Sequence, residues 1–96
     1  MSLTHKLVTL NSNTATLLTD PPSEQDFYKR DLTISIQNLD SERFIFVGDS
    51  TVTTANYGYR INPGDYIAFQ NLSPNDEVYA VSDSGTPNAG IIKVIL

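Results

Sequence analysis

The alternation of apolar and polar side chains at residues 32–37 constrains the fold most. This stretch reads Leu-Thr-Ile-Ser-Ile-Gln, a period of two that gives an extended strand one apolar face and one polar face. Similar short apolar bursts recur along the chain, and each ends at Asn, Asp, Gly, Pro or Ser. Such spacing is typical of antiparallel sandwiches and barrels. We therefore predict an all-β fold, an antiparallel β-sandwich of jelly-roll-like or Ig-like type with seven or eight short strands.

The expected strands can be placed from these bursts. Phe-Ile-Phe-Val at residues 44–47 is continuous enough in apolar character to be buried on both faces of its strand. Leu7 is the expected buried position of the first strand. The final stretch, 91–96, is so apolar that it must be paired, because an exposed edge of this kind would aggregate. The expected strands are residues 5–10, 14–19, 32–37, 43–47, 66–70, 77–82 and 91–96, with shorter extended pieces at 51–54 and 60–61.

The turns and the N-terminal part give further expectations. Asn62-Pro63-Gly64-Asp65 favours a type II turn, since Gly tolerates the positive φ that its third position requires. The two prolines at 21 and 22 make residues 20–26 a loop. The two strands that precede this loop can pair as a hairpin, or residues 1–26 can form a loose arm that orders against a neighbour.

Size and cysteine content point to one small domain, residues 1–96. The chain has 96 residues, no cysteine and one histidine, so neither a disulfide framework nor a zinc finger can stabilise it. Oligomerisation is the remaining route to added stability.

Charge argues against two kinds of partner. The formal net charge of −5 repels phosphate, so we expect no nucleic-acid binding, and it disfavours anionic membrane surfaces. No segment is apolar for long enough to span a bilayer, and the start lacks the apolar core of a signal peptide. The expected place of synthesis is a cytoplasm.

No stretch carries recognisable reaction chemistry, so we predict no catalytic residue, no cofactor and no assigned metal site. His5 is the single histidine and lies near the N-terminus, and there is no Gly-x-Ser-x-Gly elbow and no phosphate-binding glycine motif. Asp76 and Glu77 are adjacent and would point to opposite faces of a strand. A calcium site between two loops stays open. The other interpretation is local turn bonding, which is favoured for Asp49, Asp65, Asp76 and Asp83.

Two groups of residues are candidates for partner contacts. Tyr57, Tyr59 and Arg60 are residue types enriched at binding hot spots, and a loop can present them outward. The structural alternative is that one tyrosine caps the open end of the sandwich, with its ring buried and its hydroxyl in water. Lys29 and Arg30 form the one adjacent basic pair, which is either a solvated strand edge or a contact with an anion or a partner.

From Leu32 onward, about two-thirds of the chain resembles small structural proteins of tailed-bacteriophage virions. In that group a strand ending in Gln-Asn-Leu leads to a glycine turn, a Thr-Thr-x-x-Gly loop, a Pro-Gly turn, a Tyr-Ala strand and a final strand. The resemblance implies a virion β-sandwich without enzymatic activity. The matching segments are residues 32–39, 45–48, 52–59, 61–66, 77–82 and 84–86.

The resemblance leads to one main functional hypothesis and two alternatives. The main hypothesis is a capsid decoration, or cement, protein that binds the major capsid protein on the outside of a phage head. It would act as a homotrimer in the virion, where several modest contacts reinforce one another, with residues 1–26 as the gripping arm. The alternatives are a receptor- or glycan-binding module that uses Tyr57 and Tyr59, and a tail or neck component.

Overall fold

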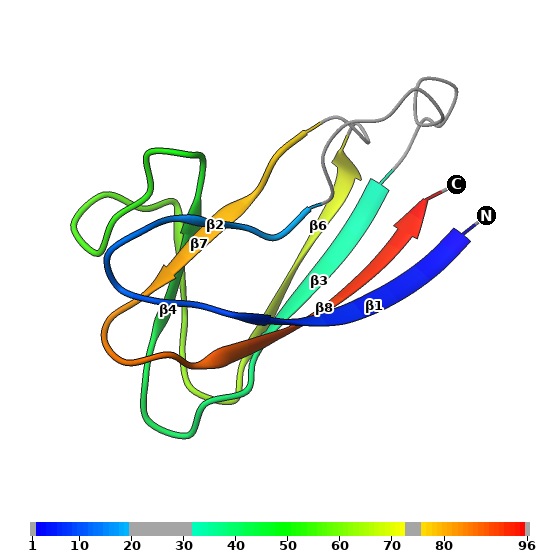
Figure 1. Cartoon of the computed structure of the whole chain (residues 1–96). Coiled ribbons are helices and arrows are strands. Elements are labelled where there is room, and N and C mark those ends of the chain that lie inside the picture. The colour runs from blue at the N-terminus through cyan, green and yellow to red at the C-terminus, as the bar shows by residue number, and fades with distance from the viewer. Residues whose placement is uncertain (1, 20–31, 73–75, 96) are drawn as a thin grey trace.

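The computed structural model describes residues 2–19, 32–72 and 76–95 (Figure 1). The regular elements in these ranges are all strands, eight in number, which confirms the all-β prediction. The strands are β1 (Ser2–Thr9), β2 (Thr16–Leu17), β3 (Leu32–Asn38), β4 (Ile45–Gly48), β5 (Tyr59–Ile61), β6 (Tyr66–Leu72), β7 (Tyr79–Ser82) and β8 (Asn88–Ile95).

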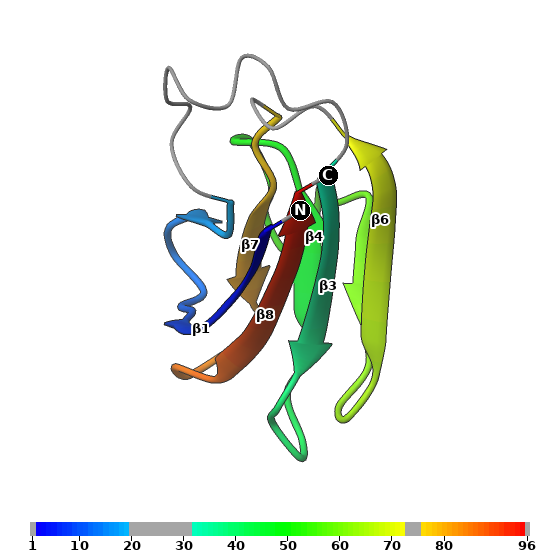
Figure 2. The ribbon, with the colours of Figure 1, turned by 90° about the vertical axis from the view of Figure 1, so that its right-hand side faces the viewer.

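The strands form two four-stranded sheets, in the orders β1-β8-β3-β6 and β2-β7-β4-β5. Figure 2 shows β1, β8, β3 and β6 side by side, with β7 and β4 behind them. Every ladder is antiparallel, and the pairs are nested: β1 pairs with β8, β2 with β7, β3 with β6, and β4 with β5. This is one long hairpin wrapped into two layers. The sandwich is therefore a jelly roll rather than an Ig-like fold.

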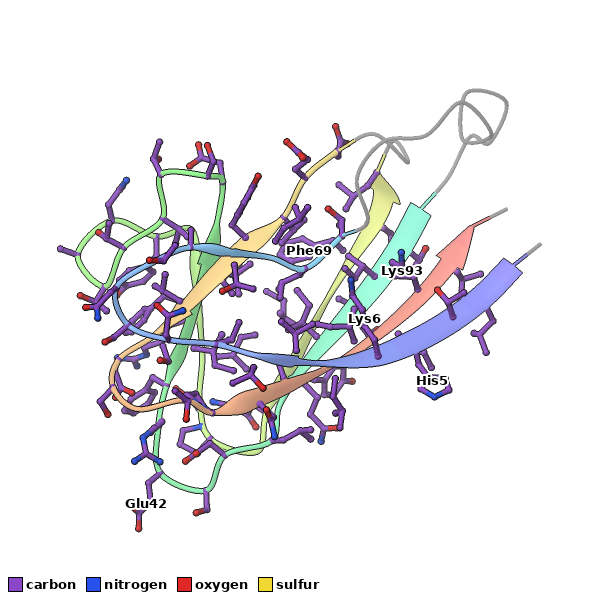
Figure 3. All side chains as sticks on the ribbon, in the orientation of Figure 1. His5, Lys6, Glu42, Phe69 and Lys93 are labelled. Carbon is purple, nitrogen blue, oxygen red and sulfur yellow. The ribbon has the colours of Figure 1, made fainter. Side chains whose placement is uncertain are left out.

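The core lies between the two sheets and follows the alternation read from the sequence. Ile34 and Ile36 of β3 point inward and are fully buried. Lys93 of β8 is also buried on this inner side, and Figure 3 shows Lys6 and Lys93 on the same side of their sheet as Phe69. The buried cluster consists of Leu10, Leu18, Ile34, Ile36, Ile45, Val47, Ile61, Ala80, Ala89 and Ile91.

Strand β4 is buried on both faces, as the sequence predicts. Ile45 and Val47 belong to the core, whereas Phe46 points outward and packs with Val81 and Val52 in a second buried cluster. The expected short strand at residues 51–54 is wrong, because Val52 folds back over Phe46 and only an isolated bridge joins Thr53 to Asn56. The loop of residues 49–58 thus covers the outer face of β2-β7-β4-β5.

The Pro-Gly turn has the predicted type. The amide of Asp65 donates to the carbonyl of Asn62 at 3.0 Å, and Gly64 has φ +79°. A hydrogen bond between the first and fourth residues with positive φ at the third defines the type II turn after proline. The turn directly connects β5 in one sheet to β6 in the other.

Buried Asn38, in the Gln-Asn-Leu segment, joins separate parts of the chain. Its side-chain amide donates to the carbonyls of Arg43, at 2.7 Å, and Ile61, at 3.1 Å. Its side-chain oxygen accepts from the amide of Asp40 at 3.0 Å. The Asn38 carbonyl also accepts from Gly64, so this residue holds the Pro-Gly turn directly. The side chain is fully buried and satisfied at both ends, as buried polar groups must be.

The N-terminal strands do not pair with each other. β1 lies at the edge of one sheet beside β8, and β2 lies at the edge of the other sheet beside β7. Residues 2–19 are thus neither a hairpin nor a loose arm, because nested pairing sends consecutive strands to different layers. Residues 20–26 lie outside the described ranges.

The last strand is paired on both sides, by β1 and by β3, as its apolar sequence requires. It begins at Asn88 instead of residue 91, because Asn88, Ala89 and Gly90 already pair with β1. Ladder hydrogen bonds use backbone groups alone, so neighbouring strands can extend a strand into residues whose side chains favour loops.

Candidate functional site

Leu7 is exposed, at 68% of its surface, and the expectation that it is buried is wrong. In β1 the odd positions Leu3 and Leu7 point out of the sandwich, whereas Val8 packs against the core. Figure 3 shows the same alternation in the two residues before Leu7, with His5 pointing away from the other sheet and Lys6 pointing toward it. Both faces of β1 carry apolar residues, so the sequence of the strand alone does not fix which face is buried.

The outward side chains of β1-β8-β3-β6 form one continuous surface, which we call the outer sheet face. The register places Leu7, Gly90, Gln37 and Tyr66 in one row across the four strands. No Asp, Glu, Lys or Arg occurs among the outward positions described on these strands. These positions are Leu3, His5, Leu7, Thr9, Thr33, Ser35, Gln37, Tyr66, Ala68, Gln70, Asn88, Gly90, Ile92 and Val94.

Exposed apolar side chains concentrate on this face. Of the seven large hydrophobic side chains exposed in the described residues, four point outward from its strands and a fifth, Leu39, lies over Gly90. Single exposed apolar residues are ordinary, but a contiguous group marks an interaction surface. The four on the strands are Leu3, Leu7, Tyr66 and Ile92.

The outer sheet face is hollowed at its middle. The hollow has a volume of about 410 Å³ and is lined by His5, Lys6, Leu7, Ser35, Gln37, Tyr66, Gly90, Ile91 and Ile92. Gly90 has no side chain between Leu7 and Gln37, whereas Leu7 and Tyr66, on the two edge strands, stay exposed at 68% and 72%. The floor is therefore low at the centre and the walls are apolar.

The two candidate tyrosines are exposed but do not share a platform. Tyr57 is 45% exposed, and its ring packs on Phe46, 4.7 Å between centroids, on the outer side of β4. Tyr59 is 56% exposed and packs edge-on against Phe69, 5.7 Å away, which packs against the core. The two rings thus rest on opposite sides of the sheet β2-β7-β4-β5. Each ring is therefore partly packed against a phenylalanine and partly exposed.

The remaining candidates for partner contacts are Arg60, Lys29 and Arg30. The guanidinium of Arg60 lies over the ring of Phe44, 4.9 Å from its centroid, and stays exposed on β5. Lys29 and Arg30 fall outside the described residues. The three predicted contact residues that the structure describes, Tyr57, Tyr59 and Arg60, lie in or next to the edge strand β5, although the two tyrosine rings rest on opposite sides of the sheet.

A smaller, more polar hollow of about 250 Å³ lies beside Tyr57, lined also by Asp49, Thr51 and Asn56. The Asp49 carboxylate accepts hydrogen bonds from the hydroxyl and the amide of Thr51, and these bonds hold the pKa of Asp49 below its ordinary value. The turn interpretation of Asp49 is thereby confirmed.

Asp40 behaves in the same way. Its carboxylate accepts from the amides of Glu42 and Arg43, and these two bonds, with a 3.2 Å ion pair to the Arg43 guanidinium, lower its pKa. In the ranges 2–19, 32–72 and 76–95, His and acidic side chains do not gather in threes as a metal site requires. The same ranges contain no helix that is long and apolar enough to cross a membrane.

Comparisons with known proteins give a distant structural likeness. No protein-family model matches the chain, and no curated protein matches it. A chain from a solved structure of Bacillus endospore appendages, described as a novel family of disulfide-linked pili, is similar with a TM-score of 0.55. The identity is 13%, and the match covers 99% of this chain and 86% of the other. At that identity the likeness supports the fold, a β-sandwich, and nothing finer.

Proposed function

We propose that this chain is a non-enzymatic structural subunit that works by being built into a larger protein assembly. The observation that carries the proposal is the outer sheet face, which is four strands wide, has no Asp, Glu, Lys or Arg among its described outward positions, and exposes Leu3, Leu7, Tyr66 and Ile92. Depletion of charge and enrichment of aromatic and aliphatic side chains characterise the buried centres of protein interfaces. The similar solved chain comes from pili, which are themselves protein assemblies.

Within this class, we propose a capsid decoration protein of a tailed-phage head, with the major capsid protein as partner. The support is the resemblance from Leu32 onward, together with the jelly-roll topology, which is frequent in viral capsid proteins. Two pieces of the resembling pattern also touch, because Asn38 of Gln-Asn-Leu bonds the Pro-Gly turn at Gly64. The homo-oligomer, favoured as a trimer by the sequence, and the location in the virion are parts of this proposal.

The attachment surface in this proposal is the aromatic edge, defined as Tyr57, Tyr59 and Arg60. All three are exposed, and they are residue types that contribute strongly to binding. Residues 2–19 are not proposed as a gripping arm, because β1 and β2 are edge strands of the two sheets. Deleting them would damage both sheets, so loss of attachment after that deletion would not identify an arm.

The test is co-sedimentation of the purified chain with undecorated heads of a tailed phage that encodes it. We expect the chain to pellet with heads, and Tyr59→Ala combined with Arg60→Ala to weaken the binding about tenfold or more. Ser84→Ala, at an exposed position of another loop, is the matched control. A chain that stays in the supernatant with heads but pellets with tails would replace the decoration role with a tail or neck role.

A second candidate, a glycan-binding module, is favoured by the polar hollow beside Tyr57. An exposed aromatic ring next to the Asp49 carboxylate and the Asn56 amide can stack on a sugar and bond its hydroxyls. Binding to a glycan array that is lost in both Tyr57→Ala and Asp49→Ala would support it. An array without any bound glycan would remove it.

A further inference from the structure

We propose that a second copy of this chain covers the outer sheet face. This inference deepens the proposed function, because it names the first partner that the subunit of an assembly would bind. It rests on four properties of that face: its lack of cover, its charge, its shape and its size.

The lack of cover is specific to one sheet. On β2-β7-β4-β5 the outward residues Phe46 and Val81 are buried, because the loop of residues 49–58 packs Val52 and Tyr57 against them. On β1-β8-β3-β6 no segment of the described chain does this, apart from Leu39 over Gly90. The described residues therefore cover the apolar side chains on one outer face and leave those on the other exposed.

Charge selects the chemistry of the occupant. The outward positions described on the four strands carry no Asp, Glu, Lys or Arg, and His5 is the one imidazole among them. A strongly charged partner would lose hydration there without any compensating ion pair. A second copy also carries a net charge of −5 and would be repelled elsewhere, but two outer sheet faces meet without like charges in contact.

Shape makes the face complementary to itself. One hollow of about 410 Å³ and two projecting side chains, Leu7 and Tyr66, lie on the same surface. When both partners carry a projection and a hollow, a twofold arrangement lets each copy insert into the other. A trimer would instead bury this face against a different surface of the neighbouring copy.

The size is sufficient for a stable contact. Four strands about 4.8 Å apart and eight residues rising about 3.3 Å each give a face of about 19 by 26 Å, or about 500 Å² in projection. The accessible surface of a corrugated face exceeds its projection. Standard interfaces take about 800 Å² of accessible surface from each partner, so this face is of the right order.

The experiment is light scattering and sedimentation equilibrium on the purified chain over a range of concentrations. We expect an oligomer in which Leu7→Glu raises the dissociation constant about tenfold or more, by placing like charges in the contact. The matched control is Thr54→Glu, which adds the same charge at an exposed position of the loop that covers the other sheet. We expect the control to keep the oligomer.

A second variant keeps the test independent of the introduced charge. Gly90→Val fills the floor of the hollow with a β-branched residue at a strand position whose added Cβ would meet only ordinary contacts with Leu39. We expect it to weaken the oligomer while circular dichroism and thermal unfolding, measured at equal monomer concentration, stay those of a folded sandwich.

The outcomes separate this inference from the proposed function. A wild-type chain that stays monomeric at the highest soluble concentration would overturn the inference, as would an oligomer unaffected by both variants. A monomer that still pellets with heads would refute self-association and keep the decoration role. An oligomer that the variants dissociate, but that binds neither heads nor tails, would support self-association and refute the decoration role. A dimer that the variants dissociate supports the twofold contact, and a trimer, in which this face would meet a different surface of the neighbouring copy, overturns it.

Discussion

The two outer faces of this jelly roll both carry apolar side chains, which are buried on one sheet and exposed on the other. On one sheet Phe46 and Val81 are 8% and 2% exposed, because residues 49–58 fold over them. On the other sheet Leu7 and Tyr66 are 68% and 72% exposed. Apolar residues therefore stabilise the monomer on the first face, whereas on the second they remain in contact with water.

The difference shows that outward apolar residues on a strand have two distinct uses. Where a loop covers them, they form a third layer and extend the core. Where they stay bare, their burial free energy is available for association rather than for folding. Mutations should separate these two uses, since the first group changes unfolding and the second changes assembly.

The largest expected effect is on the covered face. Phe46→Ala removes a ring that packs against Val52, Val81 and Tyr57, and we expect the free energy of unfolding to fall by about 3 kcal/mol. Denaturant unfolding at a concentration where the chain is monomeric measures it. A loss below about 1 kcal/mol would mean that the loop does not form a packed layer.

The same glycine substitution on the two faces should give different results. A Cβ at Gly48 would lie 3.2 Å from Cγ2 of Val52, so Gly48→Ala should push the loop outward and cost about 1 kcal/mol. A Cβ at Gly90 would come no closer than 3.5 Å to Leu39, so Gly90→Ala should be neutral or slightly stabilising within a strand. Equal thermal shifts for the two variants would contradict the comparison.

The covering loop should also respond to acid. Thr51 bonds the ionised form of Asp49, so the pKa of Asp49 in the folded chain lies below its ordinary value near 3.8. The resulting stability is present above that value and is lost as the pH falls through the lower folded pKa. We expect the Thr51 amide resonance to shift over this range in NMR spectra. Asp49→Ala should abolish this change in the Thr51 resonance. A midpoint of the change above pH 4 would mean that the pKa of Asp49 is raised rather than lowered, and would contradict the prediction.

The smallest effect on stability belongs to the bare face. Leu7→Ala and Tyr66→Ala remove side chains that are mostly in water, so the unfolding free energy of the monomer should change by less than about 0.5 kcal/mol. Unfolding of dilute protein tests this directly. If either substitution costs as much as Phe46→Ala, the two faces are not different in kind.

Much of the fold was predictable because its causes are local. Alternation at residues 32–37 gave the inward pair Ile34 and Ile36, and the apolar run at 44–47 gave a strand buried on both faces. The turn at 62–65 followed from the conformational freedom of Gly64 after a proline.

The candidate site was less predictable because its causes are distant in sequence. The orientation of Leu7 is set by pairing with Gly90, and β1 carries apolar residues on both faces, Leu3 and Leu7 on one and Val8 on the other. The cover that separates the two outer faces comes from residues 49–58, where Thr-Val-Thr-Thr suggested a strand. Tyr57 and Tyr59 were chosen as candidate contact residues by residue type. That the ring of Tyr57 packs on Phe46 and the ring of Tyr59 on Phe69 could be seen only in the three-dimensional arrangement.

The nested pairing of the strands has a consequence for the time at which the outer sheet face comes into existence. β8 lies inside its sheet, between β1 and β3, so that sheet cannot close until the last strand in the sequence has left the ribosome. Contacts between residues this far apart also form slowly. The bare apolar face is therefore assembled only after β8 has been synthesised, which shortens the period in which a partly folded chain presents it to other nascent chains.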